Sequence, residues 1–365
     1  MERQSITPRP DWRARVEALG FDFHTIDGEP YWDEAACYRF SEDEIDQLDD
    51  ATGELERLCF GVVERVIGER IYDRLFIPEP AWPLIEESWQ RGDRNLVGRF
   101  DISWSGKGDP KLLEYNADTP TALFEASVVQ WDWLESVKGG ADQFNSIHEK
   151  LAEAWAAYGV RGPVHFTCVR DHAEDYATTT YLRDTCMQAG HDTAFLYIDE
   201  MGWNGLGFVD GEDRPITTLF KLYPWEWLMN EEFGQHIGPS RIHMIEPAWK
   251  MILSNKAVLP LLWEMYEGHP NLLPASFDPA GIKGGCVAKP VFGREGQDVT
   301  IHKAGTTEAA PGMVYQALAP VFEQGGRHAV IGSWVIASQP AGIGIREDAG
   351  PVTVNTSRFV PHYFE

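Results

Sequence analysis

The 365-residue sequence predicts a mixed α/β protein with one parallel and one antiparallel sheet. Helical patterns over 144–158 and 177–189 alternate with strand patterns over 164–169 and 193–198, which is the order expected of a βαβ unit with parallel strands. Over residues 267–365 Gly, Val and Pro become frequent and the apolar runs become short, as in an antiparallel sheet joined by loops. A chain of this length can bury a large core, so we expect one composite unit with an approximate βαβ-type lobe at 140–245.

The N-terminal part is predicted to contain a short helix followed by a long one. The short helix covers residues 12–19. Ser41 and Glu44 have the spacing of a capping box, and apolar residues follow at helical spacing as far as Ile67. Three prolines between residues 78 and 83 then separate this helix from another short one.

A β-hairpin is predicted next. Apolar and polar residues alternate over 99–104, which is the period of a half-buried strand. The turn sequence SGKGDP follows, and a second strand covers residues 111–116. Pro120 then opens a helix expected over 121–135, because proline is favoured in the first helical turn.

Four polar residues of this hairpin form the first candidate site. If the two strands pair, Asp101 lies near Glu114 and Asn116, and Arg99 lies close by. Two carboxylates and an amide oxygen are the hard ligands that suit Mg²⁺, which proteins usually hold together with substrate phosphates. The alternative is a surface hairpin whose charges are simply solvated.

The second candidate is the segment VAKPVFGREGQDVTI, residues 287–301. A strand ends at Lys289, and a loop then carries Gly293 and Arg294 before the next strand. Glycines let the backbone approach a phosphate closely, and the two cations would neutralise its charge. The alternative is a glycine-containing hairpin with two solvated cations. The segment lacks the GxxxxGK[ST] pattern of a Walker A loop.

Two further positions carry charge next to apolar or glycine-rich sequence. Lys256 stands near the start of an apolar helix, where it lines a site or extends its side chain to water. Arg346 and Glu347 follow the glycine-rich strand GIGI and face either solvent or a site. The short strands expected in this part are 286–291, 298–302, 314–318, 329–337, 342–346 and 352–355.

Composition limits the function classes. Acidic residues outnumber basic ones by 57 to 31, and the net charge of -26 disfavours nucleic acid and anionic membranes as partners. The sequence contains no signal peptide and no apolar run long enough to span a membrane. Its five cysteines are scattered without CxxC pairs, which predicts free thiols and a cytoplasmic location. It also lacks the GxSxG and HExxH motifs of hydrolases.

Five motifs taken together resemble the glutathionylspermidine synthase family, in its stand-alone, synthetase-like form. They are GRFDISWSGKGDPKLLEYNADTPTALFEA, KLYPWEW, SNKAVLPLLW, VAKPVFGREG and GIGIRE, in that order along the chain. The resemblance implies an ATP-grasp fold with a preceding βαβ-type lobe and an approximate nucleotide-binding lobe at 246–365. It also implies an ATP- and Mg²⁺-dependent ligase that joins a peptide or other carboxylate to an amine through an acyl phosphate.

The resemblance assigns roles to individual residues. Asp101, Glu114 and Asn116 correspond to magnesium ligands. Arg99 and Arg346 correspond to arginines at the reacting groups. The remaining assignments are Lys256, Lys289, Gly293, Arg294 and Gln316 for the nucleotide, and Thr119, Thr121 and Glu226 for the other substrates.

Two departures from the family limit what the resemblance implies. No amidase domain precedes the synthetase region, so hydrolysis of glutathionylspermidine is not expected. The acidic pair that binds a polyamine in the family is expected near residues 175–181, which read DYATTTY here. We therefore expect an amine other than spermidine, and the oligomeric state stays open. The alternative function is a nucleotide-binding protein without ligase turnover that acts through a partner, although Arg99 favours the ligase.

Overall fold

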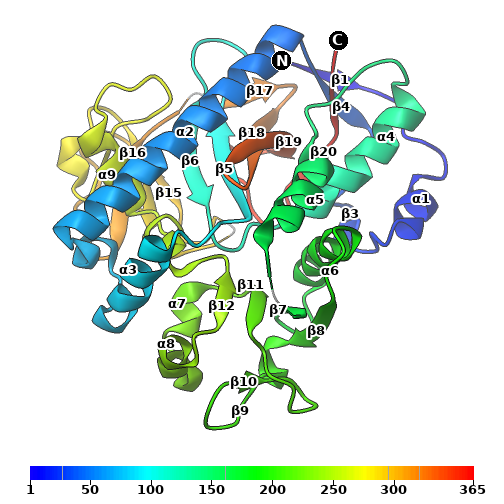
Figure 1. Cartoon of the computed structure of the whole chain (residues 1–365). Helices are drawn as coiled ribbons and strands as arrows, with labels where there is room; N and C mark the ends of the chain where they lie inside the picture. The colour runs from blue at the N-terminus through cyan, green and yellow to red at the C-terminus, as the bar shows by residue number, and fades with distance from the viewer. Residues whose placement is uncertain (27, 161, 295, 320) are drawn as a thin grey trace.

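The computed structural model describes residues 1–26, 28–160, 162–294, 296–319 and 321–365. Its central antiparallel sheet has the order β20-β19-β18-β5-β6, and β17 also pairs with β18. Figure 1 shows the cyan hairpin of β5 and β6 beside the orange-red strands β18 and β19. The strands are β5 (Val97–Ser103), β6 (Lys111–Asn116), β17 (Phe322–Gln324), β18 (Arg327–Ile336), β19 (Gln339–Asp348) and β20 (Arg358–Val360).

A second sheet of four strands has the order β12-β11-β7-β8, and all of its pairs are parallel. This confirms the parallel βαβ pattern predicted from the sequence. The helices α5 and α6 contact each other beside this sheet (Figure 1). These elements are α5 (Ile147–Tyr158), β7 (Val164–Cys168), α6 (Ala173–Gln188), β8 (Thr193–Tyr197), β11 (Thr218–Leu222) and β12 (His243–Ile245).

The smaller sheets complete the strand inventory. One has the order β13-β16-β14-β15, and another joins the two chain ends through β1-β4-β21. Their strands are β1 (Glu2–Ser5), β4 (Ala36–Phe40), β13 (Ala275–Ser276), β14 (Cys286–Pro290), β15 (Thr300–His302), β16 (Met313–Ala317) and β21 (His362–Phe364). Two hairpins add β2 (Thr25–Ile26) with β3 (Glu29–Pro30), and β9 (Gly202–Trp203) with β10 (Phe208–Val209).

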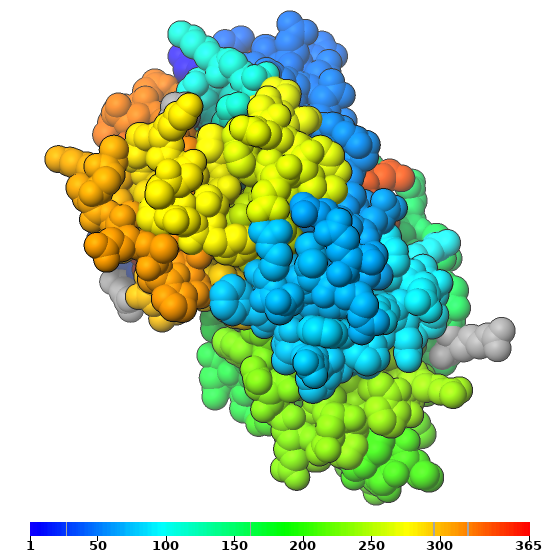
Figure 2. Space-filling model, turned by 90° about the vertical axis from the view of Figure 1, so that its left-hand side faces the viewer, coloured from blue at the N-terminus to red at the C-terminus, as the bar shows by residue number. Residues whose placement is uncertain are grey.

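The longest helix, α2 (Glu42–Glu69), covers the central sheet. Ser41 accepts a hydrogen bond from the backbone N–H of Glu44, and the Glu44 carboxylate accepts one from the Ser41 N–H, which confirms the capping box. The apolar side chains of α2 are buried in the main core. Figure 2 shows the face on which the blue segment with α2 and α3 (Trp82–Arg91) lies against the yellow segment that follows α9 (Val258–Met265).

The remaining helices are short. They are α1 (Trp12–Ala18), α4 (Gln130–Val137), α7 (Trp225–Leu228) and α8 (Ile237–Ser240). Single 3₁₀ turns cover Tyr72–Leu75, Glu79–Ala81, Ile198–Glu200, Glu232–His236, Ala248–Ile252 and Pro279–Gly281. No helix within the described residues is both long enough and apolar enough to cross a membrane.

One expected helix start and one expected strand differ from the structure. The helix expected from residue 121 begins only after Ala122, whose left-handed φ of 66° is incompatible with a helix, and it opens with a π-helical turn at Glu125–Val129. The strand expected at 352–355 is a loop. Its apolar β-branched residues suggested a strand, but the backbone carbonyls of Val354 and Asn355 instead accept hydrogen bonds from Arg346.

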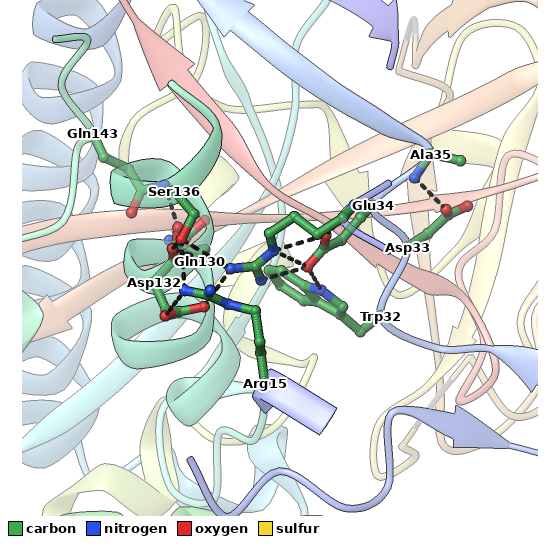
Figure 3. Close-up of polar contacts among 10 residues, drawn as sticks. Arg15, Trp32, Asp33, Glu34, Ala35, Gln130, Asp132, Ser136 and Gln143 are labelled. Carbon is green, nitrogen blue, oxygen red and sulfur yellow. Dashed lines mark hydrogen bonds and ion pairs between the residues drawn. The ribbon is translucent and has the colours of Figure 1, made fainter. Parts of the chain in front are cut away.

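The N-terminal segment is fastened to α4 by a polar network (Figure 3). Arg15 donates to Asp132 at 3.1 Å, and the Trp32 indole N–H donates to Glu34 at 3.0 Å. Arg9 joins the two halves, with ion pairs of 2.6 Å to Glu34 and 2.5 Å to Asp132. The network fixes α4 and therefore the π-helical turn that precedes it.

A fully buried ion pair fixes the start of β5. Lys250 and Glu246 lie 2.7 Å apart, and neither side chain is exposed. Glu246 also accepts hydrogen bonds from the backbone N–H groups of Leu96 and Val97, and Lys250 donates to the Val97 carbonyl at 2.6 Å. Both charges are thus compensated and hydrogen-bonded, which is the condition for burying them.

We predict that Glu246→Gln lowers the free energy of unfolding by about 3–5 kcal/mol, because it leaves the Lys250 ammonium buried without its counter-ion. Urea denaturation measures this change. The matched control is Glu87→Gln, which removes a carboxylate from an exposed i,i+4 pair with Arg91 and should cost at most about 0.5 kcal/mol. Equal effects of the two substitutions would contradict the role given to the buried pair.

Candidate active site

The hairpin pairs in the register that the sequence predicted. Asp101 lies opposite Glu114, and Arg99 lies opposite Asn116. A β-bulge follows Asp101, so the two carboxylates are at the point where the strand bends. On the other side of β5, Asp101 is opposite Gly332 of β18. A Cβ at Gly332 would lie 2.8 Å from Cδ of Arg99, so glycine leaves the space that this arginine occupies.

Arg99 is held in place by two kinds of contact. Its guanidinium binds both carboxylate oxygens of Asp101, at 2.7 and 3.2 Å, and donates to the Thr121 carbonyl at 2.6 Å. The paired geometry is the bidentate one that arginine favours. Burial raises the pKa of Asp101 above its ordinary value, and the charge of Arg99 opposes this rise.

Cations from the C-terminal third reach the same carboxylates. Lys256 lies 3.3 Å from Glu114 and donates to the Gly293 carbonyl at 2.7 Å. Lys289 donates to the Leu113 carbonyl and to the Gln316 amide oxygen, both at 2.8 Å. Side chains from the hairpin and from the C-terminal third therefore lie at one place, while their roles stay predictions.

The pKa values of this group reflect burial and mutual charge. Burial alone would raise the pKa of Glu114, but Lys256 and Lys289 hold it at about 2. Burial lowers the pKa of Lys289 to about 8, and the negative charge of Glu114 limits that fall. Glu114 is thus a carboxylate at neutral pH, whereas Lys289 is close to losing its proton.

A cavity of about 230 Å³ lies between the hairpin, the start of α6 and the loop after β14. Most of the predicted site residues line it. They are Arg99, Asp101, Glu114, Asn116, Thr119, Thr121, Glu226, Lys256, Gly293, Arg294 and Arg346. The other two, Lys289 and Gln316, line a neighbouring cavity of about 120 Å³. Asp101, Glu114 and Lys256 border both cavities, which places the carboxylates at their junction.

The smaller cavity has a largely apolar wall beyond Lys289. That wall includes Val287, Ile301 and Leu318. Gln316 stands at its inner end and donates to the Leu112 carbonyl at 2.9 Å. An apolar recess with a few fixed polar groups is the usual form of a small-molecule site.

Arg294 links the loop after β14 to the opposite wall of the larger cavity. It donates to the Thr119 hydroxyl at 2.7 Å, and its guanidinium lies 5.0 Å from the centre of the Trp227 ring. The residue before Thr119, Asp118, is buried against Lys221 at 2.5 Å and accepts the Trp225 N–H at 2.8 Å. This buried pair fixes the turn that presents Thr119.

Arg346 and Glu347 point to different places. Arg346 lines the larger cavity and is anchored by the carbonyls of Val354, Asn355 and Ser357. Glu347 is buried away from it and binds Arg3 at 2.7 Å and the Tyr38 hydroxyl at 2.8 Å. The sequence left the direction of both side chains open, and only Arg346 belongs to the cavity.

Two acidic cavity residues were not predicted from the sequence. His172, Glu174 and Asp175 all line the larger cavity, at the start of α6. The helix was expected from residue 177 but begins at Ala173, so these carboxylates were not recognised as a cluster. The signal was the acidic first turn, which is favoured at a helix N-terminus. Asp175 is the first residue of the segment 175–181, and Glu174 directly precedes it, so acidic side chains border this segment in the cavity.

Asp101, Glu114 and Asn116 form a donor set that fits Mg²⁺. It consists of two half-buried carboxylates and an amide oxygen beside a cavity lined by cations, as hard-cation sites with substrate phosphates require. Within the described residues there is no cluster of three or more His, Cys, Asp or Glu side chains suited to a metal.

The overall fold is that of ATP-grasp-type enzymes. The solved structure of a glutathione synthetase-like effector from Globodera pallida superposes with a TM-score of 0.60 at 12% identity, covering 97% of this chain and 95% of that one. At that identity the likeness shows the fold alone. It agrees with the ATP-grasp class that the sequence motifs implied.

The chain belongs to the glutathionylspermidine synthase family, because the sequence model described as "Glutathionylspermidine synthase preATP-grasp" matches residues 3–365. A Haemophilus influenzae protein named "Putative acid--amine ligase" is 40% identical, covering 98% of this chain and 97% of that protein. The Escherichia coli bifunctional glutathionylspermidine synthetase/amidase is 28% identical, covering 96% of this chain and 62% of its own length. The chain is accordingly an enzyme of the ligase class, as its motifs predicted.

We predict that Lys289→Met changes the pH dependence of stability. Between pH 8 and 10.5 the unfolded wild-type chain binds the proton of Lys289 more tightly than the folded chain does, so this residue makes stability rise with pH. The difference between the two pKa values corresponds to roughly 3 kcal/mol. Urea titrations at pH 7.5, 9 and 10.5 should show that the free energy of unfolding rises less with pH in Lys289→Met than in the wild type.

The exposed lysine Lys107 provides the control for this measurement, and Lys107→Met should follow the wild-type curve. If the wild type and Lys289→Met keep a constant difference in unfolding free energy from pH 7.5 to 10.5, the depressed pKa of Lys289 is wrong.

Proposed function

We propose that this enzyme uses ATP and Mg²⁺ to join a carboxylic acid to a primary amine through an acyl-phosphate intermediate. One observation carries the proposal. Half-buried carboxylates from the hairpin and cations from the C-terminal third meet at the junction of two cavities. Such a junction suits a triphosphate whose charge is shared between a divalent cation and lysines.

The nucleotide is assigned to the smaller cavity and the junction. Its base would occupy the apolar recess near Ile301 and Leu318, and its phosphates would lie against Lys256 and Lys289. Asp101, Glu114 and Asn116 would hold Mg²⁺, which would supply positive charge to neutralise the phosphates. Arg294, tethered to Thr119, would close the loop after β14 over the phosphates.

The chemistry would take place beside Arg99. The acid's carboxylate oxygen attacks the γ-phosphorus of ATP, and the bond to the ADP oxygen breaks, which gives an acyl phosphate and ADP. The amine nitrogen then attacks the acyl carbon, and phosphate leaves with the electrons of the C–O bond. The fixed guanidinium of Arg99 would stabilise the charge that develops on the acyl oxygen, with Arg346 beside it.

Both substrates are assigned to the larger cavity. Thr119 and Thr121 would offer hydroxyl groups to the acid. Glu174, Asp175 and Glu226 line the same cavity and would supply acidic partners for a positively charged amine. Burial and the negative charge of Asp118 both raise the pKa of Glu226. A cation bound beside these acids would offset the repulsion between them and favour the ionised form of Glu226. A cationic amine is therefore accommodated, although the segment 178–180 is threonine.

A nucleophile trap tests the proposed reaction whichever amine the enzyme uses. Purified enzyme, ATP, Mg²⁺ and a panel of short peptides and other small acids are incubated with hydroxylamine, which captures acyl phosphates as hydroxamates. We expect one acid to give hydroxamate together with equal ADP and phosphate. Tight Mg·ATP binding without turnover on any acid would favour the alternative, a nucleotide-binding protein without ligase activity.

We predict that Asp101→Asn and Glu114→Gln each reduce hydroxamate formation about 100-fold or more, because each removes a negatively charged ligand of the Mg²⁺ that would neutralise the phosphates. Asp109→Asn, an exposed position in the turn of the same hairpin, should retain wild-type turnover. Circular dichroism and thermal unfolding establish that the variants are folded. Wild-type turnover in either site variant would remove the metal assignment.

A further inference from the structure

A separate cavity of about 530 Å³ lies between α3, α8 and β12. Figure 1 shows these elements next to one another, together with α7. The helix α7 divides this cavity from the larger cavity of the candidate active site, because Trp225 lines the former whereas Glu226 and Trp227 line the latter. None of the described residues lines both cavities. The volume is within the range of roughly 300–1,000 Å³ that is typical of small-molecule pockets.

Much of the wall of this separate cavity is apolar. The apolar side chains are Leu84, Trp225, Ile237, Ile242, Met244 and Ala248. All of them except Leu84 are buried, so this part of the wall belongs to the folded core. Such a wall suits the hydrocarbon part of a ligand, because contact between apolar surfaces releases the water beside them.

One hydroxyl group of the wall has no hydrogen-bond partner. Ser88 of α3 lines the cavity and is only 1% exposed, and its Oγ has no partner among the described residues. The buried hydroxyls of Thr52 and Ser127 differ, since each donates to the carbonyl four residues earlier in its own helix. Because buried polar groups are nearly always hydrogen-bonded, the Ser88 hydroxyl points to a partner that a ligand would supply.

The charged side chains of the cavity leave one cation without an acidic partner. Asp93 accepts two hydrogen bonds from Arg91, at 2.6 and 3.1 Å, and Glu87 lies 3.7 Å from the same guanidinium. Arg241, the exposed residue that ends α8, has no ion pair and no side-chain hydrogen bond within the described part of the chain. Burial lowers the pKa of His243, so this imidazole adds no charge at neutral pH. The Arg241 guanidinium is therefore available to an anion.

These features together select a class of ligand. A guanidinium group binds a carboxylate through two parallel hydrogen bonds. Glu87 and Asp93 line the same cavity, so they would repel the second negative charge of a phosphate more than they would oppose a singly charged carboxylate. The apolar wall requires a hydrocarbon body, and the Ser88 hydroxyl offers a hydrogen bond to one further polar group.

We propose that the cavity between α3, α8 and β12 is a second ligand site, which binds a small monocarboxylate whose apolar body carries one further hydrogen-bonding group. The carboxylate pairs with Arg241, the body lies against the apolar wall, and the further group bonds to the Ser88 hydroxyl. The site is independent of the proposed ligase reaction, because it shares no described residue with the larger cavity.

Calorimetric titration of the whole chain with four probe acids tests this site. The probes are octanoate, 8-hydroxyoctanoate, 3-phenylpropanoate and 3-(4-hydroxyphenyl)propanoate, each compared with its uncharged primary amide. We expect the acids to bind more tightly than their amides, and Arg241→Gln to lower the affinity for the acids about 10-fold and to remove that preference. Arg13→Gln, which changes an exposed arginine outside the cavity, should keep the wild-type affinities.

The variant Ser88→Ala separates a ligand-binding hydroxyl from a structural one. It should lower the affinity for the two hydroxylated acids about 5-fold and leave the affinity for the two plain acids unchanged. Its free energy of unfolding, measured with urea, should not fall, because Ser88 makes no side-chain hydrogen bond to a described residue. A structural hydroxyl would give the reverse result, with lower stability and unchanged affinities.

Two further variants distinguish this site from the larger cavity, whose arginines could also attract a carboxylate. Leu84→Trp fills part of the apolar wall and should abolish probe binding, whereas Arg346→Gln, in the larger cavity, should leave it unchanged. Affinity that falls in Arg346→Gln but not in Arg241→Gln would overturn the proposal. Equal binding of acids and amides, or no binding of any probe to the folded wild type, would also overturn it. If Leu84→Trp does not fold, Arg241→Gln and Ser88→Ala still decide the question.

Discussion

The pairing of β5 with β18 is the constraint on which the site depends. It inserts the N-terminal hairpin beside two C-terminal strands, so that Asp101 faces Gly332 and β19 brings Arg346 to the same cavity. The glycine is required because the Arg99 side chain passes over it. Without this long-range pairing the carboxylates would lie on an isolated hairpin, which is at best marginally stable in water.

Charge compensation explains how so many ionised groups are tolerated around the cavity. Arg99 neutralises Asp101, Lys256 neutralises Glu114, and Lys221 neutralises Asp118. Each charge is therefore desolvated only beside an opposite charge, which keeps the cost of burial low. In the proposed complex a divalent cation would pair with the hairpin acids and the phosphates would pair with the lysines. Each charged side chain would therefore keep a partner of opposite charge.

Local sequence predicted the hairpin well because its register is fixed by alternation and by a short polar turn. The pairing of Asp101 with Glu114 followed from those two features alone. The meeting of this hairpin with Lys256 and Lys289 rested instead on the family resemblance, because β5–β18 pairing leaves no local signal. The sequence also placed the start of α6 too late, so Glu174 was missed, and it read the loop 352–355 as a strand. Both errors arise where side chains and backbone serve the cavity instead of a regular element.

Acidic and basic side chains line the larger cavity together. Lys256 borders both cavities, whereas Glu174 and Glu226 line the larger one alone. Under the proposed function a phosphate would pair with the lysine and an ammonium group with the acids, so that one cavity would hold both charged groups beside Arg99. Oε1 of Glu174 has no hydrogen-bond partner within the described residues, whereas Asp101, Glu114 and Asp118 each have a cation beside them. The carboxyl group of Glu174 is therefore the one that a positively charged amine could bind without displacing a protein cation.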